Sequence, residues 1–248
     1  MPAMSSFLIS QYGRVEIWLI VPFLTDVPEG YEVEQFQYPL AMRFLNAAVV
    51  VASLCGPVFS QSWVASRFYD AASGITYSSV TMPNGVSYRI ALPIDSPTAD
   101  GIVQIVAPSK YGWCGFAWGG RMTSNPLTVA WPSKAATGEP VTVSNRWATG
   151  YSSVPAAYTG AIHTYLPISP STTNSTHWTV TARCQGCTRW GTTNIEASTS
   201  VTFAYACSTV APSTPASNTS SFSVHESPGR WAHDLTIAKN GSFATWVG

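Results

Sequence analysis

Residues 75–107, ITYSSVTMPNGVSYRIALPIDSPTADGIVQIVA, contain three short runs rich in β-branched and aromatic residues. The runs are 75–80, 87–92 and 101–107, and turn-forming residues separate them, first among them Pro83-Asn84-Gly85. Asparagine and glycine accept the backbone angles of tight turns, and proline is rare inside a central strand. The stretch therefore predicts three consecutive β-strands joined by short connections.

The same pattern continues along the rest of the chain. Prolines again separate the runs, and no stretch repeats its apolar residues with the 3.6-residue period of a helix. The further runs are 115–118, 127–131, 141–143, 161–166, 177–182 and 200–206. About nine short strands at close spacing predict an all-β fold, an antiparallel β-sandwich. The polar segment 211–221 is expected to be a loop, and we find no internal repeat or domain boundary in this part of the sequence.

The composition is typical of an extracellular β domain. The chain has 248 residues, 46% of them hydrophobic and only 10% charged, with 12 Lys and Arg against 12 Asp and Glu. A disordered tail would have high net charge and few aromatic residues, and a nucleic-acid-binding protein would carry a basic strip. The sequence has neither feature, so we expect a globular protein that does not bind nucleic acid.

An apolar run in the first quarter of the chain has the features of a secretory signal peptide, which we place at 42–60. Met42 and Arg43 precede the run, and Val58 and Ser60 stand at positions −3 and −1 of a cleavage site. The run is shorter than the roughly 20 residues that cross a bilayer, so we expect no membrane span; a buried helix or strand is the alternative. Residues 1–41 carry five acidic residues against one basic residue and are predicted to be an extension of the gene model.

Cleavage after Ser60 would leave a secreted, extracellular domain at 61–248, with its core at about 75–235. This domain has 10 Lys and Arg against 7 Asp and Glu, a formal charge of +3. A secreted protein can be glycosylated at Asn-X-Ser/Thr sequons, and this domain has three of them in turn-like stretches. We predict N-glycosylation at Asn174, Asn218 and Asn240.

Four cysteines remain in this domain, and two of them, Cys184 and Cys187, form a Cys-X-X-Cys motif. A c-type haem attachment would need His after Cys187, where Thr188 stands; zinc would need a second ligand pair, and a thioredoxin-like motif would need a βαβ context. In an oxidising compartment a local structural disulfide is the favoured interpretation. For Cys114 and Cys207, a disulfide and two buried thiols are both open.

The sequence carries neither the Gly-X-Ser-X-Gly nor the His-Glu-X-X-His signature of a hydrolase, and no acidic pair adjacent in sequence suggests a glycosidase. Side chains suited to axial ligation of a haem iron are few. By residue type alone each of them is expected to be structural. They are Met82, Met122, His163, His177, His225 and His233.

Six motifs, taken in chain order, change that expectation. They are GGRM at 119–122, LTVAW at 127–131, SNRWATGY at 144–151, NSTHW at 174–178, RCQGCTRW at 183–190 and FSVHE at 222–226. Together they resemble the cytochrome domain of fungal cellobiose dehydrogenase, of the DOMON-like type, over roughly residues 75–234. One such motif would be weak, but six in the same order are specific.

The resemblance implies an immunoglobulin-like β-sandwich that holds one haem b without a covalent bond. Met122 matches the methionine ligand of the iron in this family, His225 matches the histidine ligand, and Tyr151 matches a tyrosine that meets a haem propionate. The resemblance also implies that Cys184 and Cys187 form a disulfide.

The other candidate donors match no ligand position of the family. We therefore expect His163, His177, His233 and Met82 to be structural. Four aromatic residues are expected in the core first and at the haem second: Trp113, Phe116, Trp118 and Tyr205.

These observations predict a secreted haem b protein that transfers electrons and has no substrate-turnover site of its own. The expected donor is a flavin or quinone dehydrogenase, and the expected acceptor is a copper polysaccharide monooxygenase or ferric iron. One alternative is a haem-free, DOMON-type carbohydrate-binding module. The other is the N-terminal fragment of a full cellobiose dehydrogenase, because the sequence has no Gly-X-Gly-X-X-Gly motif of a nucleotide-binding domain.

Overall fold

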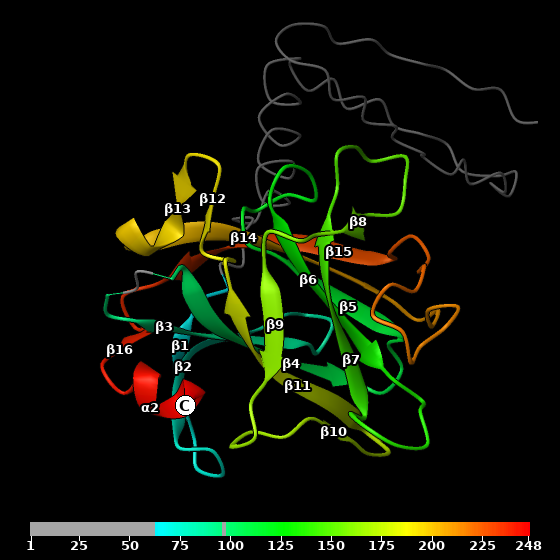
Figure 1. The fold of residues 1–248 in the computed structure, drawn as a ribbon, viewed down its shortest axis with the longest axis horizontal. Helices are drawn as coiled ribbons and strands as arrows, with labels where there is room; N and C mark the ends of the chain where they lie inside the picture. The colour runs from blue at the N-terminus through cyan, green and yellow to red at the C-terminus, as the bar shows by residue number, and fades with distance from the viewer. Residues whose placement is uncertain (1–62, 96–97) are drawn as a thin grey trace, which may run out of the picture. The chain divides into compact units, whose positions relative to one another are not determined.

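The computed structural model describes residues 63–95 and 98–248, which fold almost entirely into β-strands (Figure 1). The predicted extension at 1–41 and the predicted signal peptide at 42–60 lie outside the described residues. The strands are β1 (Ser66–Asp70), β2 (Ile75–Thr81), β3 (Ser87–Pro93), β4 (Asp100–Pro108), β5 (Trp113–Ala117), β6 (Pro126–Pro132), β7 (Val141–Trp147), β8 (Ala156–Ala157), β9 (Ile162–Tyr165), β10 (Thr172–Thr173), β11 (His177–Gln185), β12 (Arg189–Trp190), β13 (Thr193–Asn194), β14 (Ser200–Ser208), β15 (Ser227–Asp234) and β16 (Lys239–Asn240). A 3₁₀ turn, η1 (Ile195–Ala197), and a short helix, α2 (Phe243–Val247), complete the elements of these residues.

One sheet has eight strands, and its main path runs β1-β2-β3-β4-β11-β10. Strand β9 also pairs with β11, and β16 pairs with β3 in the only parallel strand pairing of the described residues. The long central strand β4 pairs with β11 from Asp100 opposite Gln185 to Pro108 opposite His177. Its sequence, DGIVQIVAP, is apolar at successive positions because both faces of this strand are covered.

The second sheet has six strands in the order β15-β14-β5-β6-β7-β8, all antiparallel. Every residue of β5 is buried, as is nearly all of β6. A strand is buried at every position only when both of its faces are covered. The inner face of this sheet packs on the other sheet, and its outer face forms the floor of the candidate site.

The main core lies between the two sheets and is rich in aromatic rings. Tyr88 of β3 packs against Phe116 of β5 with ring centroids 5.9 Å apart, and its hydroxyl donates a hydrogen bond to the carbonyl of Gly115 at 3.2 Å. Trp231 of β15 stacks on the same tyrosine at 5.5 Å. These contacts join one sheet to the other, as in a β-sandwich.

Two smaller apolar clusters lie outside the sandwich. On the eight-stranded sheet, Ile75 and Tyr77 of β2 are covered by Phe243 and Trp246 of helix α2. On the six-stranded sheet, the cluster contains Trp113 and Ala117 of β5 together with residues of β6, which alternate with the inward-facing residues of the same strands. The second cluster leads directly to the candidate site.

The sequence prediction of an all-β antiparallel sandwich is confirmed, and each of the nine expected runs overlaps a strand. Seven strands were not predicted: the edge strands β1 and β15, and the two-residue strands β8, β10, β12, β13 and β16. Strands β1 and β15 lie at sheet edges: β1 has no buried residue, and β15 begins with Ser-Pro-Gly, which has low β-propensity.

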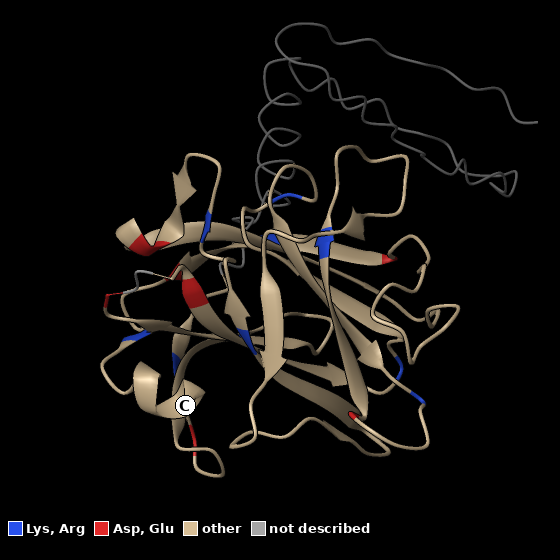
Figure 2. Cartoon of the chain, in the orientation of Figure 1, with Lys and Arg blue, Asp and Glu red and all other residues tan. Residues whose placement is uncertain are grey.

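Charged side chains are sparse over the described residues, and Lys and Arg do not gather into a continuous strip (Figure 2). Within the part of the chain that the structure describes, no helix is long and apolar enough to cross a membrane.

Candidate functional site

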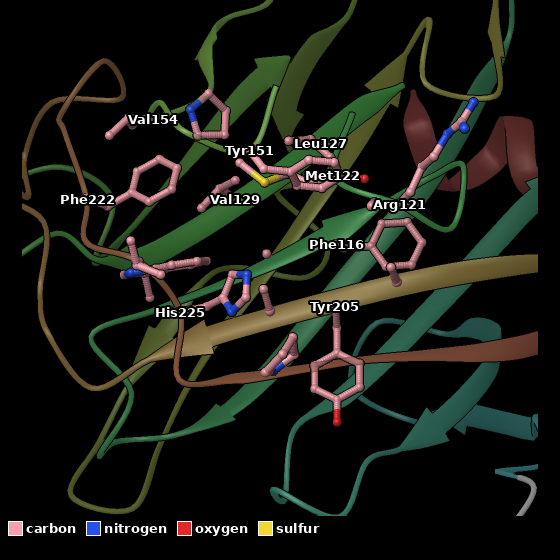
Figure 3. A pocket seen from close by; sticks show the side chains of 18 of the residues that line it. Phe116, Arg121, Met122, Leu127, Val129, Tyr151, Val154, Tyr205, Phe222 and His225 are labelled. Carbon is pink, nitrogen blue, oxygen red and sulfur yellow. The ribbon is translucent and has the colours of Figure 1, made fainter. Parts of the chain in front are cut away.

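A pocket of about 450 Å³ lies on the outer face of the six-stranded sheet (Figure 3). Its floor is made by four small residues that face each other across β5 and β14: Ala117 opposite Ala204, and Gly115 opposite Ala206. Small side chains on paired strands leave a flat surface, whereas large side chains would fill the space above the sheet. The floor therefore has the shape that a planar ligand needs.

Two of the predicted site residues project into this pocket from different segments. Met122 comes from the loop between β5 and β6, and His225 comes from the segment just before β15. Tyr151 follows β7 and lies at the pocket mouth, where 72% of its surface is exposed. The structure thus brings together three residues that span 103 positions of the sequence.

The surroundings of His225 are mostly apolar. Phe222, in the same segment, packs on Trp113 of the pocket with ring centroids 4.8 Å apart. The Nδ1 atom of His225 is inaccessible to solvent and has no hydrogen-bond partner among the described residues. A buried ring nitrogen without a partner is unusual in a folded protein. Nδ1 of His163 and Nε2 of His233 share this feature, but of these three rings only that of His225 lines the pocket.

The arginine of the SNRWATGY motif is buried and binds backbone carbonyls. Arg146 of β7 donates to the carbonyl of Pro155 at 3.1 Å and to the carbonyls of Asn218 and Ser220 at 2.9 and 2.7 Å. Pro155 belongs to one wall of the pocket, and the segment after Ser220 carries Phe222 and His225. Arg146 therefore connects the two loops that enclose the pocket. This role was not predicted from the sequence.

The charged residues that line the pocket are both cations. Arg121 precedes Met122, and Arg230 lies on β15; no Asp, Glu or Lys is among the described lining residues. Two guanidinium groups beside an apolar slot favour a ligand with an apolar body and negatively charged ends. Neither arginine was predicted to be a site residue, although Arg121 stands inside the GGRM motif.

The remaining candidate donors have structural surroundings. His163 accepts or donates a hydrogen bond at 2.9 Å with the hydroxyl of Thr128, and burial lowers its pKa to about 3. His233 is buried, and burial lowers its pKa to about 4. Met82 is buried in the main core, and His177 begins strand β11 outside the pocket lining.

Three potential metal ligands converge away from the pocket. The side chains of His163, Cys184 and Cys187 place ligand atoms within 4.8 Å of one another. Cys184 and Cys187 form a disulfide with each other, which leaves neither sulfur as a thiolate for a metal.

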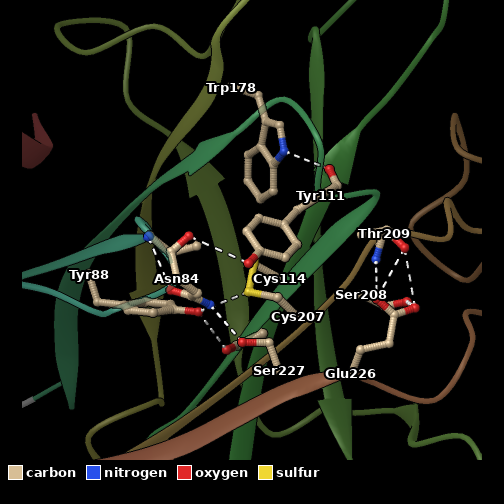
Figure 4. The surroundings of a disulfide bond; sticks show 12 residues. Asn84, Tyr88, Tyr111, Cys114, Trp178, Cys207, Ser208, Thr209, Glu226 and Ser227 are labelled. Carbon is tan, nitrogen blue, oxygen red and sulfur yellow. Dashed lines mark hydrogen bonds between the residues drawn. A yellow bond between two sulfur atoms is a disulfide. The ribbon is translucent and has the colours of Figure 1, made fainter.

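Cys114 and Cys207, whose state the sequence left open, also form a disulfide (Figure 4). They lie directly opposite each other on β5 and β14. Glu226, one residue after His225, docks on the residues that follow Cys207: its carboxylate accepts hydrogen bonds from Ser208 and Thr209 (Figure 4). The segment that carries His225 is thereby attached to the disulfide-linked strands.

The four predicted aromatic residues lie in the core or the pocket lining, and the three sequons differ in exposure. Trp113, Phe116 and Tyr205 contribute to the pocket lining, and Trp118 is a fully buried core residue. Of the three sequons, Asn174 and Asn218 are exposed, and Asn240 is half-buried on β16.

Residues 68–245 match the family model described as the cytochrome domain of cellobiose dehydrogenase. The chain belongs to this family. A Pyrroloquinoline quinone-dependent pyranose dehydrogenase of Coprinopsis cinerea is 32% identical to it over 181 residues, which make up 70% of this chain and 24% of the relative. The chain thus spans about a quarter of the length of that relative.

Solved structures of cytochrome domains have the same fold. The cytochrome b domain of pyranose dehydrogenase from Coprinopsis cinerea superposes with a TM-score of 0.64 at 29% identity, covering 74% of this chain and 94% of that domain. The cytochrome domain of Myriococcum thermophilum cellobiose dehydrogenase gives a TM-score of 0.66 at 28% identity, covering 75% and 96%. Family membership implies haem b and electron transfer for the cytochrome domain described here.

The pocket of this cytochrome domain fits a haem b group. It offers a flat floor of small residues, one thioether and one imidazole among its side chains, an imidazole nitrogen without a protein partner, and two arginines whose positive charge suits a group with two carboxylates. A Met/His donor pair is one that proteins use for electron-transfer haems. The chemistry of the donor set and the shape of the pocket therefore agree with the family assignment.

Proposed function

We propose that this chain is a secreted haem b electron-transfer protein in which Met122 and His225 are the two axial ligands of the iron. The observation that carries the proposal is the presence of both side chains in one pocket with a floor of Gly and Ala. Bound there, haem b supplies one-electron iron chemistry, and a Met/His ligand pair suits electron transfer at a raised potential.

The remaining lining residues have distinct roles in the proposal. Tyr151 lies at the exposed mouth, where its hydroxyl can donate a hydrogen bond to a propionate. Arg121 and Arg230 supply positive charge that compensates the propionates. Phe222 and Trp113 keep water from the side of the pocket where His225 stands.

An absorption spectrum of the secreted protein tests haem binding. We expect a Soret band of a low-spin haem that sharpens on reduction with dithionite. A colourless protein from haem-replete expression would overturn the proposal and would favour the alternative, a haem-free carbohydrate-binding module.

Ligand variants test the two axial residues. Met122→Ala and His225→Ala should each abolish the low-spin spectrum, because each removes one of the two donors. Met82→Leu and His177→Ala are matched controls outside the pocket lining and should leave the spectrum unchanged. Retention of the low-spin spectrum in both ligand variants would show that the iron is held elsewhere.

The proposed donor is a flavin or quinone dehydrogenase, in keeping with the dehydrogenases that carry related cytochrome domains. The proposed acceptor is a copper polysaccharide monooxygenase or ferric iron. Stopped-flow mixing of the reduced protein with each acceptor should reoxidise it in a concentration-dependent reaction. Reoxidation no faster than in buffer alone would exclude that acceptor.

Secretion and processing complete the proposal. Mass spectrometry of the secreted protein should find an N-terminus at Gln61, no peptide from residues 1–41, and glycans at Asn174, Asn218 and Asn240. Recovery of a peptide from 1–41 would contradict the proposed extension, and unmodified sequons would contradict the proposed glycosylation.

A further inference from the structure

Met122 lies in a loop without regular secondary structure between β5 and β6. The loop turns at Gly120, whose φ is 72° and where a Cβ atom would lie 2.7 Å from the carbonyl oxygen of Thr202. Only glycine tolerates both the left-handed backbone and this close approach. The turn sets the path of the chain into Met122, but it does not by itself fix the residues on either side of the methionine.

The buried side chain of Asn125 fixes the backbone on both sides of Met122. The side chain of Asn125 accepts a hydrogen bond from the backbone N–H of Gly119 at 3.0 Å through Oδ1. Its Nδ2 donates to the carbonyl of Arg121 at 2.6 Å and to the carbonyl of Thr123 at 2.9 Å. Asn125 is 1% exposed, and both of its donor hydrogens are used.

The two carbonyls that Asn125 binds belong to the residues immediately before and after Met122. A methionine side chain has three rotatable bonds and adapts to many shapes, so its own packing fixes the sulfur poorly. The thioether sulfur also carries no charge that would attract it to the iron. The position of the sulfur therefore has to be set by the backbone.

We propose that Asn125 is the positioning residue that presents the sulfur of Met122 to the iron. This inference rests on the proposed function, since it takes Met122 as an axial ligand. It adds a role for a residue that lies outside the pocket lining. The side-chain amide acts on the iron site only through the backbone on either side of Met122.

The far end of the loop has anchors of its own. The N–H of Ser124 donates to the carbonyl of Ala148 at 3.0 Å, and the indole N–H of Trp190 donates to the carbonyl of Ser124 at 3.1 Å. These bonds do not depend on the side chain of Asn125. A variant at Asn125 should therefore release Met122 while the loop stays attached to the fold.

The test is Asn125→Asp in the haem-loaded protein. Aspartate has the same shape and still accepts from Gly119, but it replaces the two donor hydrogens with an oxygen that faces two carbonyls. We expect haem to be retained, the thioether-to-iron charge-transfer band of the ferric protein to be lost, the midpoint potential to fall, and carbon monoxide to bind the ferrous protein about 10-fold faster or more.

Asn145→Asp is the matched control. Asn145 is partly buried, and its Nδ2 donates to the carbonyl of Ala161 at 2.7 Å, away from the pocket lining. The control should lose a comparable hydrogen bond and some stability but keep the charge-transfer band, the potential and the rate of carbon monoxide binding of the wild-type protein.

A folded Asn125→Asp protein with wild-type band, potential and carbon monoxide rate would overturn the proposal. If far-UV circular dichroism shows that this variant does not fold, Asn125→Ser takes its place, because one hydroxyl can hold only one of the two carbonyls and the same three changes are expected. Failure of the proposed function is a separate result: wild-type protein without haem, or Met122→Ala with the wild-type spectrum.

Discussion

Trp231 donates its indole N–H to Nδ1 of His233, 2.9 Å away and two residues along β15. Residues two apart on a strand face the same side, and here both face the main core, where His233 is fully buried against Phe203. The bond requires Nδ1 to be without a proton, so the neutral ring carries its proton on Nε2. A charged ring would lose the bond and stand unsolvated in an aromatic core.

The first prediction is a loss of stability in acid. Burial lowers the pKa of His233 to about 4, below the roughly 6.5 of an exposed histidine. Between these values the unfolded chain binds a proton that the folded chain does not, so the free energy of unfolding falls as the pH falls from about 6.5 to about 4. The full contribution is on the order of 3 kcal/mol.

Urea unfolding at several pH values checks this. His233→Gln, whose side-chain oxygen can still accept from Trp231, should flatten the pH dependence. His177→Gln is the control, since His177 is only partly buried, and should leave the slope unchanged. An unchanged slope in the His233 variant would show that another buried group, such as His163, accounts for the acid sensitivity.

The second prediction separates the two disulfides. Cys114 and Cys207 are 93 residues apart, whereas Cys184 and Cys187 are three apart. Closing a longer loop constrains the unfolded chain more, which gives about 4–5 kcal/mol for the first and about 2 kcal/mol for the second. Urea unfolding of the two double alanine variants should show the larger loss for Cys114 and Cys207, and the reverse order would refute the loop-length argument.

The third prediction concerns the pocket floor. Ala204→Phe places a ring on the flat surface between β5 and β14, where the pocket needs a small side chain. We expect a folded protein that no longer binds haem. Ala232→Phe is the control, because Ala232 is exposed on the neighbouring β15 and lies outside the pocket lining. Haem titration followed by absorption distinguishes the two variants. If Ala204→Phe binds haem as well as Ala232→Phe does, the pocket floor does not contact the haem.

The sequence predicted nine of the strands and two candidate iron ligands, but it did not predict the hydrogen bonds that fix the loops around the pocket. Alternating or continuous apolar runs mark a strand wherever it is buried, which is why β4 and β6 were predicted and the edge strand β15 was not. Met122 and His225 were predicted as ligands through motifs, and both line the pocket. Arg146 and Asn125 donate to backbone carbonyls that come close to them only in the folded protein. No local sequence pattern therefore predicts their roles.

The placement of Cys114 and Cys207 shows the same limit. Each lies in an apolar strand, and a strand pattern gives the face on which a residue lies but not its partner on another strand. The register of β5 against β14, which places Ala117 opposite Ala204, also places the two cysteines opposite each other. One structural fact therefore decides both the disulfide and the pocket floor.

The last prediction concerns the segment that carries His225. The backbone N–H of Glu226 donates to the carbonyl of Cys207 at 3.0 Å, and its carboxylate accepts from the hydroxyl of Ser208 at 3.1 Å and from the N–H of Thr209 at 3.2 Å. The Thr209 and Ser208 bonds lower the pKa of Glu226, so the carboxylate stays charged and docked at neutral pH.

Glu226→Ala should therefore loosen His225 and speed the loss of haem to an excess of apomyoglobin, by about 10-fold. Glu226→Gln should bind haem nearly as wild type does, because its amide oxygen can still accept from the N–H of Thr209 and its amide nitrogen can donate to the hydroxyl oxygen of Ser208. Glu139→Ala removes an exposed carboxylate elsewhere and should have no effect. If His225 becomes mobile in Glu226→Ala, the low-spin spectrum should weaken, and added imidazole should restore it. Haem loss at the wild-type rate would show that Phe222 and the backbone hold His225 in place without the carboxylate.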